Sequence, residues 1–288
     1  MEWHDIRDPA DPELDRLAER YGLHSLHIED CRHRNQSAKV EENHHYLFAV
    51  LKPLEVGADG SLDISDLDLF LGKDFLITVQ ESHCTPVAKI LDQAHTLAAN
   101  PRADQLFYRI TDAVVDSYLP TIDLFNDTID LLEDEVLEKP TPEVLSKIFS
   151  TKRSLIELRR VLANMRDVAG HLQRTETDVI ARDLWPFLRD IYDHLARNLD
   201  MVEMMRDLLT GSLDIYLSSV ANRPNQVMKV LTVMSTVALP ALLVTGFYGM
   251  NTKGLPWADT PHGTGIALLL MGAMTVGLAV LLRVLKWL

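Results

Sequence analysis

Residues 246–251 read GFYGMN and combine two glycines, a methionine and the amide of Asn251 at the end of an uncharged run. A helix that merely had to stop would need only one glycine or one asparagine. Carboxamide and helix-end carbonyl oxygens are neutral ligands, which attract a cation without holding it as tightly as carboxylates do. The motif therefore indicates a role beyond ending a helix, with a plain Gly/Asn helix cap as the alternative.

A second group of candidate metal ligands lies near the N-terminus. Its first three members are spaced three and four residues apart, so they would share one face of a helix, and four such donors would suffice for a metal site. The side chains are His24, His27, Cys31, His33, His44 and His45.

Two long uncharged runs near the C-terminus supply the elements that would position GFYGMN. The first run, residues 230–247, has 18 residues, and the second covers residues 266–282. As a helix the first run would be about 27 Å long, which is close to the thickness of the hydrocarbon core of a bilayer. Both runs are apolar on nearly every face, so membrane-spanning helices are preferred over buried core helices.

Basic residues at the ends of these runs predict their orientation. By the positive-inside rule, both termini face the cytoplasm, and residues 251–264 form a short outer loop. Four basic residues flank the two spans on that side, against one in the loop: Arg223, Lys229, Arg283 and Lys286 against Lys253.

Charge divides the chain into an acidic body and a basic tail. Residues 1–220 hold 41 of the 42 Asp and Glu side chains, but 23 of the 28 Lys and Arg side chains. A body of this charge repels phosphate backbones, so a nucleic-acid partner is excluded. The sequence contains no Gly-rich phosphate loop, nucleophile elbow or His-Glu-x-x-His motif, so an enzyme is not expected.

Hydrophobic patterning changes at about residue 103. Before this point short extended and helical stretches alternate, as in an α/β domain. After it, leucines recur at helical spacing, which predicts long amphipathic helices. The last of these helices has no convincing stop between Trp185 and Met250. The expected strands are residues 45–54, 66–72 and 74–80, with a GKD turn between the last two and a helix over 85–98.

Residues 212–251 closely resemble the first membrane helix of the CorA superfamily of divalent metal ion transporters. Their sequence is SLDIYLSSVANRPNQVMKVLTVMSTVALPALLVTGFYGMN. Upstream, YGLHSLHIEDCRHRNQSAKVEENHHYLFAVL resembles the N-terminal domain of that family, and LDLFLGKDFLITVQ resembles its hairpin. The terminal RVLKWL is similar to a short form of its basic tail. The position of Gly-Met-Asn after the first of two C-terminal spans makes the resemblance specific.

The resemblance implies an α+β cytoplasmic domain of α/β/α type, long stalk helices and two C-terminal membrane helices, assembled as a funnel-shaped homopentamer in a bacterial inner membrane. The first membrane helices line a central pore, in which five copies of Asn251 bind a hydrated divalent cation through its water shell. The lipid bilayer and divalent cations are the other expected partners, and no cofactor is expected. The implied domains are 1–102 (α/β), 103–224 (stalk), 225–250 (first membrane helix), 251–264 (outer loop) and 265–288 (second membrane helix and basic end).

The implied selectivity filter consists of Gly249, Met250 and Asn251. Below it, the side chains at helical spacing face the same axis, where apolar ones would form dewetting constrictions and polar ones a ring at the inner mouth. Lipid or the second span is the alternative environment for some of them. The predicted pore residues are Asn225, Met228, Leu231 or Thr232, Ser235, Leu239, Leu242 or Leu243, and Gly246.

The outer loop, NTKGLPWADTPHGT, departs from the magnesium-type pattern, in which Met-Pro-Glu follows the signature and glutamates ring the entrance. Here a Leu-Pro-Trp sequence ends at Trp257 and Lys253 adds a positive charge, so the electrostatic concentration of divalent ions is weaker. The form GMNTKGLPW resembles the ZntB branch, which is associated with zinc. Asp259 could partly replace the missing carboxylates, and His262 could contact a softer metal.

The sequence thus predicts divalent cation transport, with zinc ahead of magnesium, cobalt and nickel, and with proton coupling as a further hypothesis. A magnesium or cobalt channel of the CorA type is the closest alternative, and a membrane-anchored scaffold is a more distant one. For the N-terminal histidines and Cys31, a structural or surface role is preferred to a metal site, because the resemblance places them in a packed helix and the strand that follows.

Overall fold

The computed structural model describes residues 1–33, 36–57, 61–93, 101–175, 177–250, 254–257, 260–285 and 287. The chain forms two compact units, Met1–Asp214 (unit 1) and Ile215–Leu288 (unit 2). The boundary between them falls within one long helix, α7 (Trp185–Tyr248), which contributes residues to both units. Each unit is described by itself.

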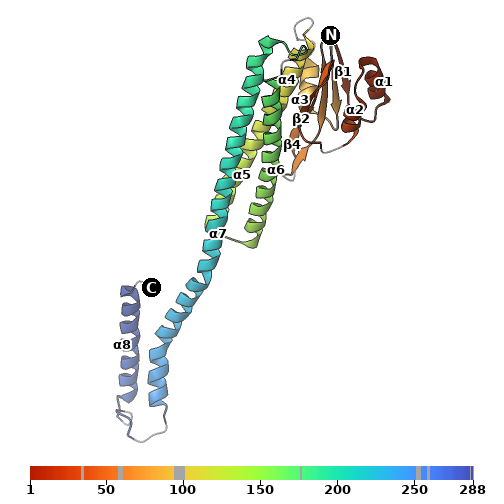
Figure 1. Cartoon of the computed structure of the whole chain (residues 1–288). Helices are drawn as coiled ribbons and strands as arrows, with labels where there is room; N and C mark the ends of the chain where they lie inside the picture. Colours follow the sequence, from red (N-terminus) through yellow and green to blue (C-terminus); the bar gives the residue numbers. More distant parts are fainter. Residues whose placement is uncertain are drawn as a thin grey trace. The chain divides into compact units, whose positions relative to one another are not determined.

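Unit 1 is built on a five-stranded sheet with the order β1-β7-β6-β3-β2 (Figure 1). Strands β1 and β7 run parallel, and the other neighbouring pairs are antiparallel. Every residue of β3 and β6 is buried, so both faces of the sheet are covered. The strands are β1 (Glu2–Ile6), β2 (Lys39–Glu42), β3 (Tyr46–Leu51), β6 (Leu67–Gly72) and β7 (Phe75–Gln80), and a separate hairpin pairs β4 (Leu54–Val56) with β5 (Leu62–Ile64).

Two short helices, α1 (Pro12–Tyr21) and α2 (Ser25–Arg32), cover one face of this sheet (Figure 1). Alternate residues of β3, such as Phe48 and Val50, pack there with Leu14 and Ile28 of the helices. On the other face α4 (Ala103–Asp116) packs against β6 and β7, and α3 (Thr85–Gln93) packs against α4. The layers are therefore helix, sheet and helix.

Long helices follow the sheet. Helix α5 (Tyr118–Glu138) packs against α6 (Pro142–Leu172), and buried α5 residues recur every three or four positions, for example at Phe125, Ile129 and Leu132. Thr141 caps α6, because its hydroxyl accepts the Val144 N–H while Pro142 occupies the first turn. No strand is assigned among the described residues after β7.

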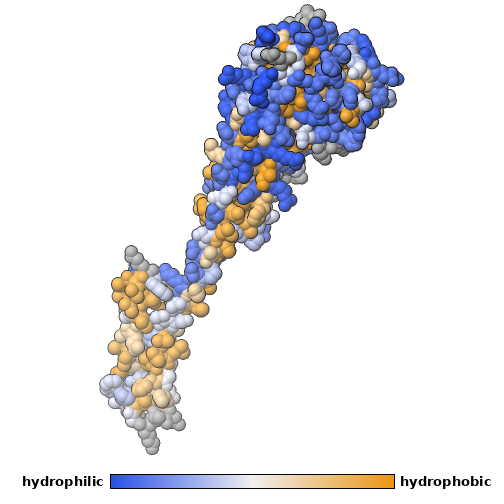
Figure 2. All heavy atoms as spheres, in the orientation of Figure 1, coloured by the Kyte–Doolittle hydropathy of each residue, from blue (hydrophilic) through white to orange (hydrophobic). Residues whose placement is uncertain are grey.

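Unit 2 holds the C-terminal part of α7 and helix α8 (Gly263–Val284). Both helices are long and apolar enough to cross a membrane, and apolar side chains make up much of the face of this segment that Figure 2 shows. The predicted fold class, an α/β domain followed by long helices and two C-terminal candidate spans, is confirmed. Helix α7 ends at Tyr248, two residues before the predicted end, and both Pro224 and Pro240 lie inside it.

The strand predicted over residues 45–54 was too long. The structure divides it into β3 and β4 at Pro53, because proline has no N–H to continue the ladder. The predicted hairpin is confirmed as β6 and β7. Of the helix expected over 85–98, the structure describes Thr85–Gln93, and residues 94–100 lie outside the described part of the chain.

Candidate functional site

The end of α7 carries the described part of the Gly-Met-Asn motif. The Gly249 N–H donates to the Thr245 carbonyl at 2.8 Å, and the Met250 N–H reaches the Phe247 carbonyl at 3.4 Å. A Cβ atom on residue 249 would lie 2.8 Å from the same Thr245 oxygen, closer than packing allows, so the tight turn requires glycine. Asn251, the predicted amide ligand, lies outside the described residues.

Exposure divides α7 into two sides beside the motif. Seven positions between 231 and 250 are buried or half-buried, and their spacing places them on one side of the helix: Val233, Thr236, Val237, Pro240, Ala241, Val244 and Tyr248. The residues predicted to face the pore between positions 231 and 249 are all exposed. At about 100° per residue, they lie on roughly the opposite side of the helix from the covered positions.

The exposed side is largely apolar and contains a glycine. Leu231, Leu239 and Leu242 are 63%, 50% and 68% exposed. A Cβ atom on Gly246 would meet no heavy atom of the described residues within 4 Å. Because packing against the described residues does not require a small residue there, Gly246 is suited to the close approach of another molecule.

At the inner end of the predicted pore face, three exposed residues also line a cavity. Asn225, Met228 and Thr232 line a cavity of about 470 Å³, which Leu285 and Trp287 line from the end of α8. The Trp287 N–H donates to the Leu282 carbonyl at 2.9 Å and extends the last turn of α8. For these three positions, the second span is thus a neighbour, as the sequence left open.

The described part of the outer loop is sharply turned. Trp257 adopts a positive φ of 59°, which is uncommon for a residue with a side chain, and its carbonyl accepts the Thr260 hydroxyl at 2.7 Å. Trp257 is 56% exposed, and His262 is exposed just before α8. Lys253 and Asp259, the two predicted charged residues of the loop, lie outside the described residues.

The histidines of α2 have structural roles in unit 1. His24 caps α2, since its Nδ1 accepts the Leu26 N–H at 3.2 Å. His27 is buried, stacks on Phe48 with ring centroids 4.4 Å apart, and places one ring nitrogen 2.8 Å from the Tyr46 hydroxyl. Its other ring nitrogen lies 3.2 Å from Glu41. Within the described residues, no group of three or more His, Cys, Asp or Glu side chains is arranged to hold a metal.

Replacing His27 with alanine should lower the free energy of unfolding by about 1–3 kcal/mol, because Tyr46 and Glu41 each lose a hydrogen-bond partner. Metal affinity should not change. Thermal melting and a zinc titration of the full-length protein, with and without the substitution, check this expectation. Loss of a bound zinc ion with an unchanged melting temperature would instead identify His27 as a ligand.

Buried charges in unit 1 form a cluster that sequence patterns did not predict. Lys52 and Asp66, both nearly inaccessible, form an ion pair, and Asp66 also accepts the Gln36 N–H at 2.9 Å. Asp68 lies in β6, two residues after Asp66 in the chain. Burial and the nearby Asp66 raise the pKa of Asp68 to about 7. Burial, together with Asp68, also raises the pKa of the Cys31 thiol. The other residues of β6 are apolar or glycine, so Asp68 was the only indication of this cluster in the sequence of the strand.

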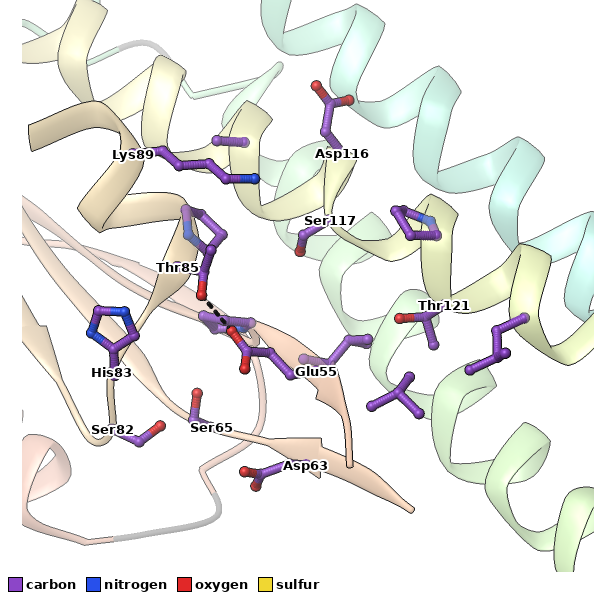
Figure 3. Close-up of a pocket in the computed structure, with 17 residues that line it drawn as sticks. Glu55, Asp63, Ser65, Ser82, His83, Thr85, Lys89, Asp116, Ser117 and Thr121 are labelled. Atoms are coloured by element: carbon purple, nitrogen blue, oxygen red, sulfur yellow. Dashed lines mark hydrogen bonds between the residues drawn. The ribbon is translucent and has the colours of Figure 1, made fainter. Parts of the chain in front are cut away.

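A cavity of about 680 Å³ opens in unit 1 between the β4–β5 hairpin, the start of α3 and the junction of α4 and α5 (Figure 3). The Thr85 hydroxyl donates to Glu55 at 2.6 Å across one wall. Asp63 and Asp116 lie at opposite ends of the view in Figure 3, and Lys89 also lines the cavity. The charges are mixed and do not converge, so the lining selects no ligand class.

Comparison with known proteins gives concordant matches along the chain. The family described as CorA-like Mg2+ transporter protein matches residues 1–284. The cobalt/magnesium transport protein CorA of Thermotoga maritima is 36% identical over 279 residues, which cover 96% of this chain and 80% of that protein.

Solved structures agree with this match. The complete structure of the CorA magnesium transporter from Methanocaldococcus jannaschii has a TM-score of 0.83 and 25% identity, covering 99% of this chain and 91% of that one. The ZntB cytoplasmic domain from Vibrio parahaemolyticus has a TM-score of 0.64 at 12% identity, covering 77% of this chain and 88% of that one, so it shows the shared fold alone.

Proposed function

Because the chain belongs to the family of CorA-like Mg2+ transporter proteins, we propose that it carries divalent cations across a membrane through a pore at the axis of a homopentamer. Membership makes it an ion transporter rather than an enzyme, as the sequence predicted. The observation that carries the pore proposal is the exposed side of α7, which leads along the helix to Gly249 and faces away from the positions buried in unit 2.

The exposed side of α7 has residues that fit a position at the central axis of an assembly of several copies of the chain. Lipid could cover its leucines, but lipid does not require glycine at position 246 or the hydroxyl of Ser235. Five such helices around an axis would bring Gly246 close to its copies and align Leu239 and Leu242 as apolar constrictions. The filter above them would be Gly249, Met250 and a ring of five Asn251 amides, which bind the cation through its water shell. The inner ring would be Asn225.

The substrate is the finer part of the proposal. Cobalt and magnesium stand in the name of a relative that is 36% identical along most of the chain, whereas the likeness to ZntB concerns the fold alone. Zinc is favoured by the outer loop, where Leu-Pro-Trp stands and Lys253 replaces a negative entrance with a positive charge. The overall match outweighs one loop, so cobalt and magnesium come first and zinc second.

Membrane orientation is proposed from charge. Four basic residues flank the two candidate spans at the ends away from the connecting loop, and one lies in that loop. Both termini and the acidic unit 1 therefore belong on the cytoplasmic side of a bacterial inner membrane.

Ion uptake by the purified protein in liposomes tests the function and the substrate together. We expect uptake of Co2+ and Mg2+ down their gradients at a rate independent of a pH gradient, with slower uptake of Zn2+. Zinc uptake that exceeds both and rises with an inward proton gradient would instead place the protein with the zinc transporters.

Two results would overturn transport itself. One is uptake of all three ions no faster than in protein-free liposomes. The other is an assembled particle, imaged in the same lipid, without a hole along its symmetry axis. Either result would favour the anchored scaffold, for which two spans suffice and an amide ring has no purpose.

A further inference from the structure

Asp68 is a carboxyl group enclosed in the apolar layer between the sheet and helices α1 and α2. It is 2% exposed. Across the sheet it pairs with Val50 of β3 and Val79 of β7, and both valines belong to the hydrophobic cluster beneath the two helices. The Cys31 thiol of α2 hydrogen bonds with the carboxyl group, but Oδ1 has no hydrogen-bond partner among the described residues.

The charges around Asp68 oppose its ionisation. Asp66, which lies just before β6, and Asp30 on α2 both raise the pKa of Asp68. Lys52 lowers the pKa of Asp68, but it already forms an ion pair with Asp66. Asp30 is likewise paired with Lys39, at 2.7 Å. Among the described residues, a carboxylate at Asp68 would therefore be a buried charge without its own counterion, which is unfavourable.

Helix α2 is the element that can respond most readily to a charge at Asp68. It has eight residues, of which His27, Ile28 and Cys31 are buried, and Cys31 contacts the carboxyl group directly. The strands on the other sides of Asp68 are held by the ladder hydrogen bonds of the sheet. Water can therefore reach the carboxylate at lower cost by lifting α2 than by opening the sheet.

We propose that Asp68 is a proton-binding site that couples the pH of the surrounding solution to the seating of α2 on the sheet. In the protonated form the neutral carboxyl group accepts the thiol hydrogen bond and α2 is closed. Loss of the proton to solvent leaves a carboxylate, and α2 opens more often to hydrate it. The site requires no metal and does not depend on the proposed transport activity.

The direction of the pH effect follows from the raised pKa. An ordinary aspartate in the unfolded chain titrates near pH 4, and burial raises the pKa of Asp68 to about 7. The folded state therefore binds the extra proton between these values, and its stability falls as the pH rises through this window. One pH unit above the folded pKa, the open population of α2 can rise by about tenfold.

Hydrogen–deuterium exchange of the full-length protein in lipid nanodiscs tests this coupling. Wild type and Asp68→Asn are compared at the same pH, first at pH 6 and then at pH 8, so that intrinsic exchange rates cancel. We expect amides of residues 26–33 to exchange within twofold of each other in the two proteins at pH 6. At pH 8 the wild type should exchange up to about tenfold faster, because asparagine cannot ionise.

Two further variants separate a proton switch from a simple structural role. Asp63→Asn removes an exposed carboxyl group from β5 and should leave the pH dependence of α2 unchanged. Cys31→Ala should keep the step and move it to somewhat higher pH, because the thiol hydrogen bond lowers the pKa of Asp68; a persistent step shows that the carboxyl group and not the thiol titrates. Equal exchange in wild type and Asp68→Asn at both pH values, or a constant ratio between them, would overturn the proposal.

Discussion

Replacing Asn251 with leucine should reduce divalent cation uptake by roughly fiftyfold or more while the protein still inserts and assembles. A pentamer would lose five amide groups at once. If each amide contributes about 0.5 kcal/mol through a hydrogen bond to the hydration shell of the ion, the summed loss is about 2.5 kcal/mol. A loss of that size corresponds to roughly 70-fold in rate. Initial rates of Co2+ uptake into liposomes, at matched protein density, provide the measurement.

The same substitution elsewhere on α7 is the matched control. Asn222 is exposed and lies on α7, away from the helix side that carries the predicted pore residues. Asn222→Leu should leave uptake within about twofold of wild type, since a surface substitution of this kind changes little. Unchanged uptake in Asn251→Leu would remove the amide ring from the transport proposal and return Gly-Met-Asn to a helix cap.

The two candidate spans and the hairpin β6–β7 could be predicted from sequence because local patterning determines them. An uncharged run of 18 residues has few soluble alternatives, and the GKD turn joins two stretches rich in β-branched and aromatic residues. The long α7 was predictable for a related reason. Its leucines recur at helical spacing up to the first candidate span, and Pro224 and Pro240 do not end the helix.

The parallel pairing of β1 with β7 could not be predicted in this way. Glu2 pairs with Phe75 across more than seventy intervening residues. The five residues of β1 are mostly polar, and their pattern does not predict a strand. Its place depends on tertiary contacts, such as Ile6 in the hydrophobic cluster and the hydrogen bond from Trp3 to Thr78 at 3.2 Å. Tertiary context here overrides local propensity.

The candidate site was predictable in part. Helical spacing gives one side of α7, and the structure leaves that side exposed from residue 231 onward. Spacing alone could not show that the end of α8 lies beside Asn225, because this contact depends on how two helices cross. The buried carboxyl group of Asp68 was also beyond the sequence, since its register on β6 decides whether it faces helices or solvent.

The second large effect is expected in the core of unit 1, where Lys52 and Asp66 form their buried ion pair. Lys52→Met keeps the length of the side chain and removes the ammonium group. Within the described part of the chain, the buried Asp66 carboxylate then keeps only the hydrogen bond from the Gln36 N–H. Removing one partner of a buried pair costs about 3–5 kcal/mol, because the other charge is left uncompensated.

For a unit of this size, each kcal/mol lowers the melting temperature by roughly 2–4 °C, so Lys52→Met should lower it by about 10 °C. Thermal unfolding of the full-length protein in detergent measures the shift. The double variant Lys52→Met/Asp66→Asn should recover most of it, since asparagine still accepts the Gln36 N–H but carries no charge. The exposed pair of Lys147 and Glu135, 2.8 Å apart, provides the control, and Lys147→Met should cost less than about 1 kcal/mol.

Lys52 also affects the proposed proton-binding site at Asp68. Its ammonium group lowers the pKa of Asp68, whereas burial and Asp66 raise it. In Lys52→Met the pKa of Asp68 should therefore rise further, and the step in α2 exchange should move to higher pH. In the double variant, which removes both the cation and the neighbouring carboxylate, the step should return toward its wild-type position. A step that stays at the same pH in both variants would show that these charges do not act on Asp68.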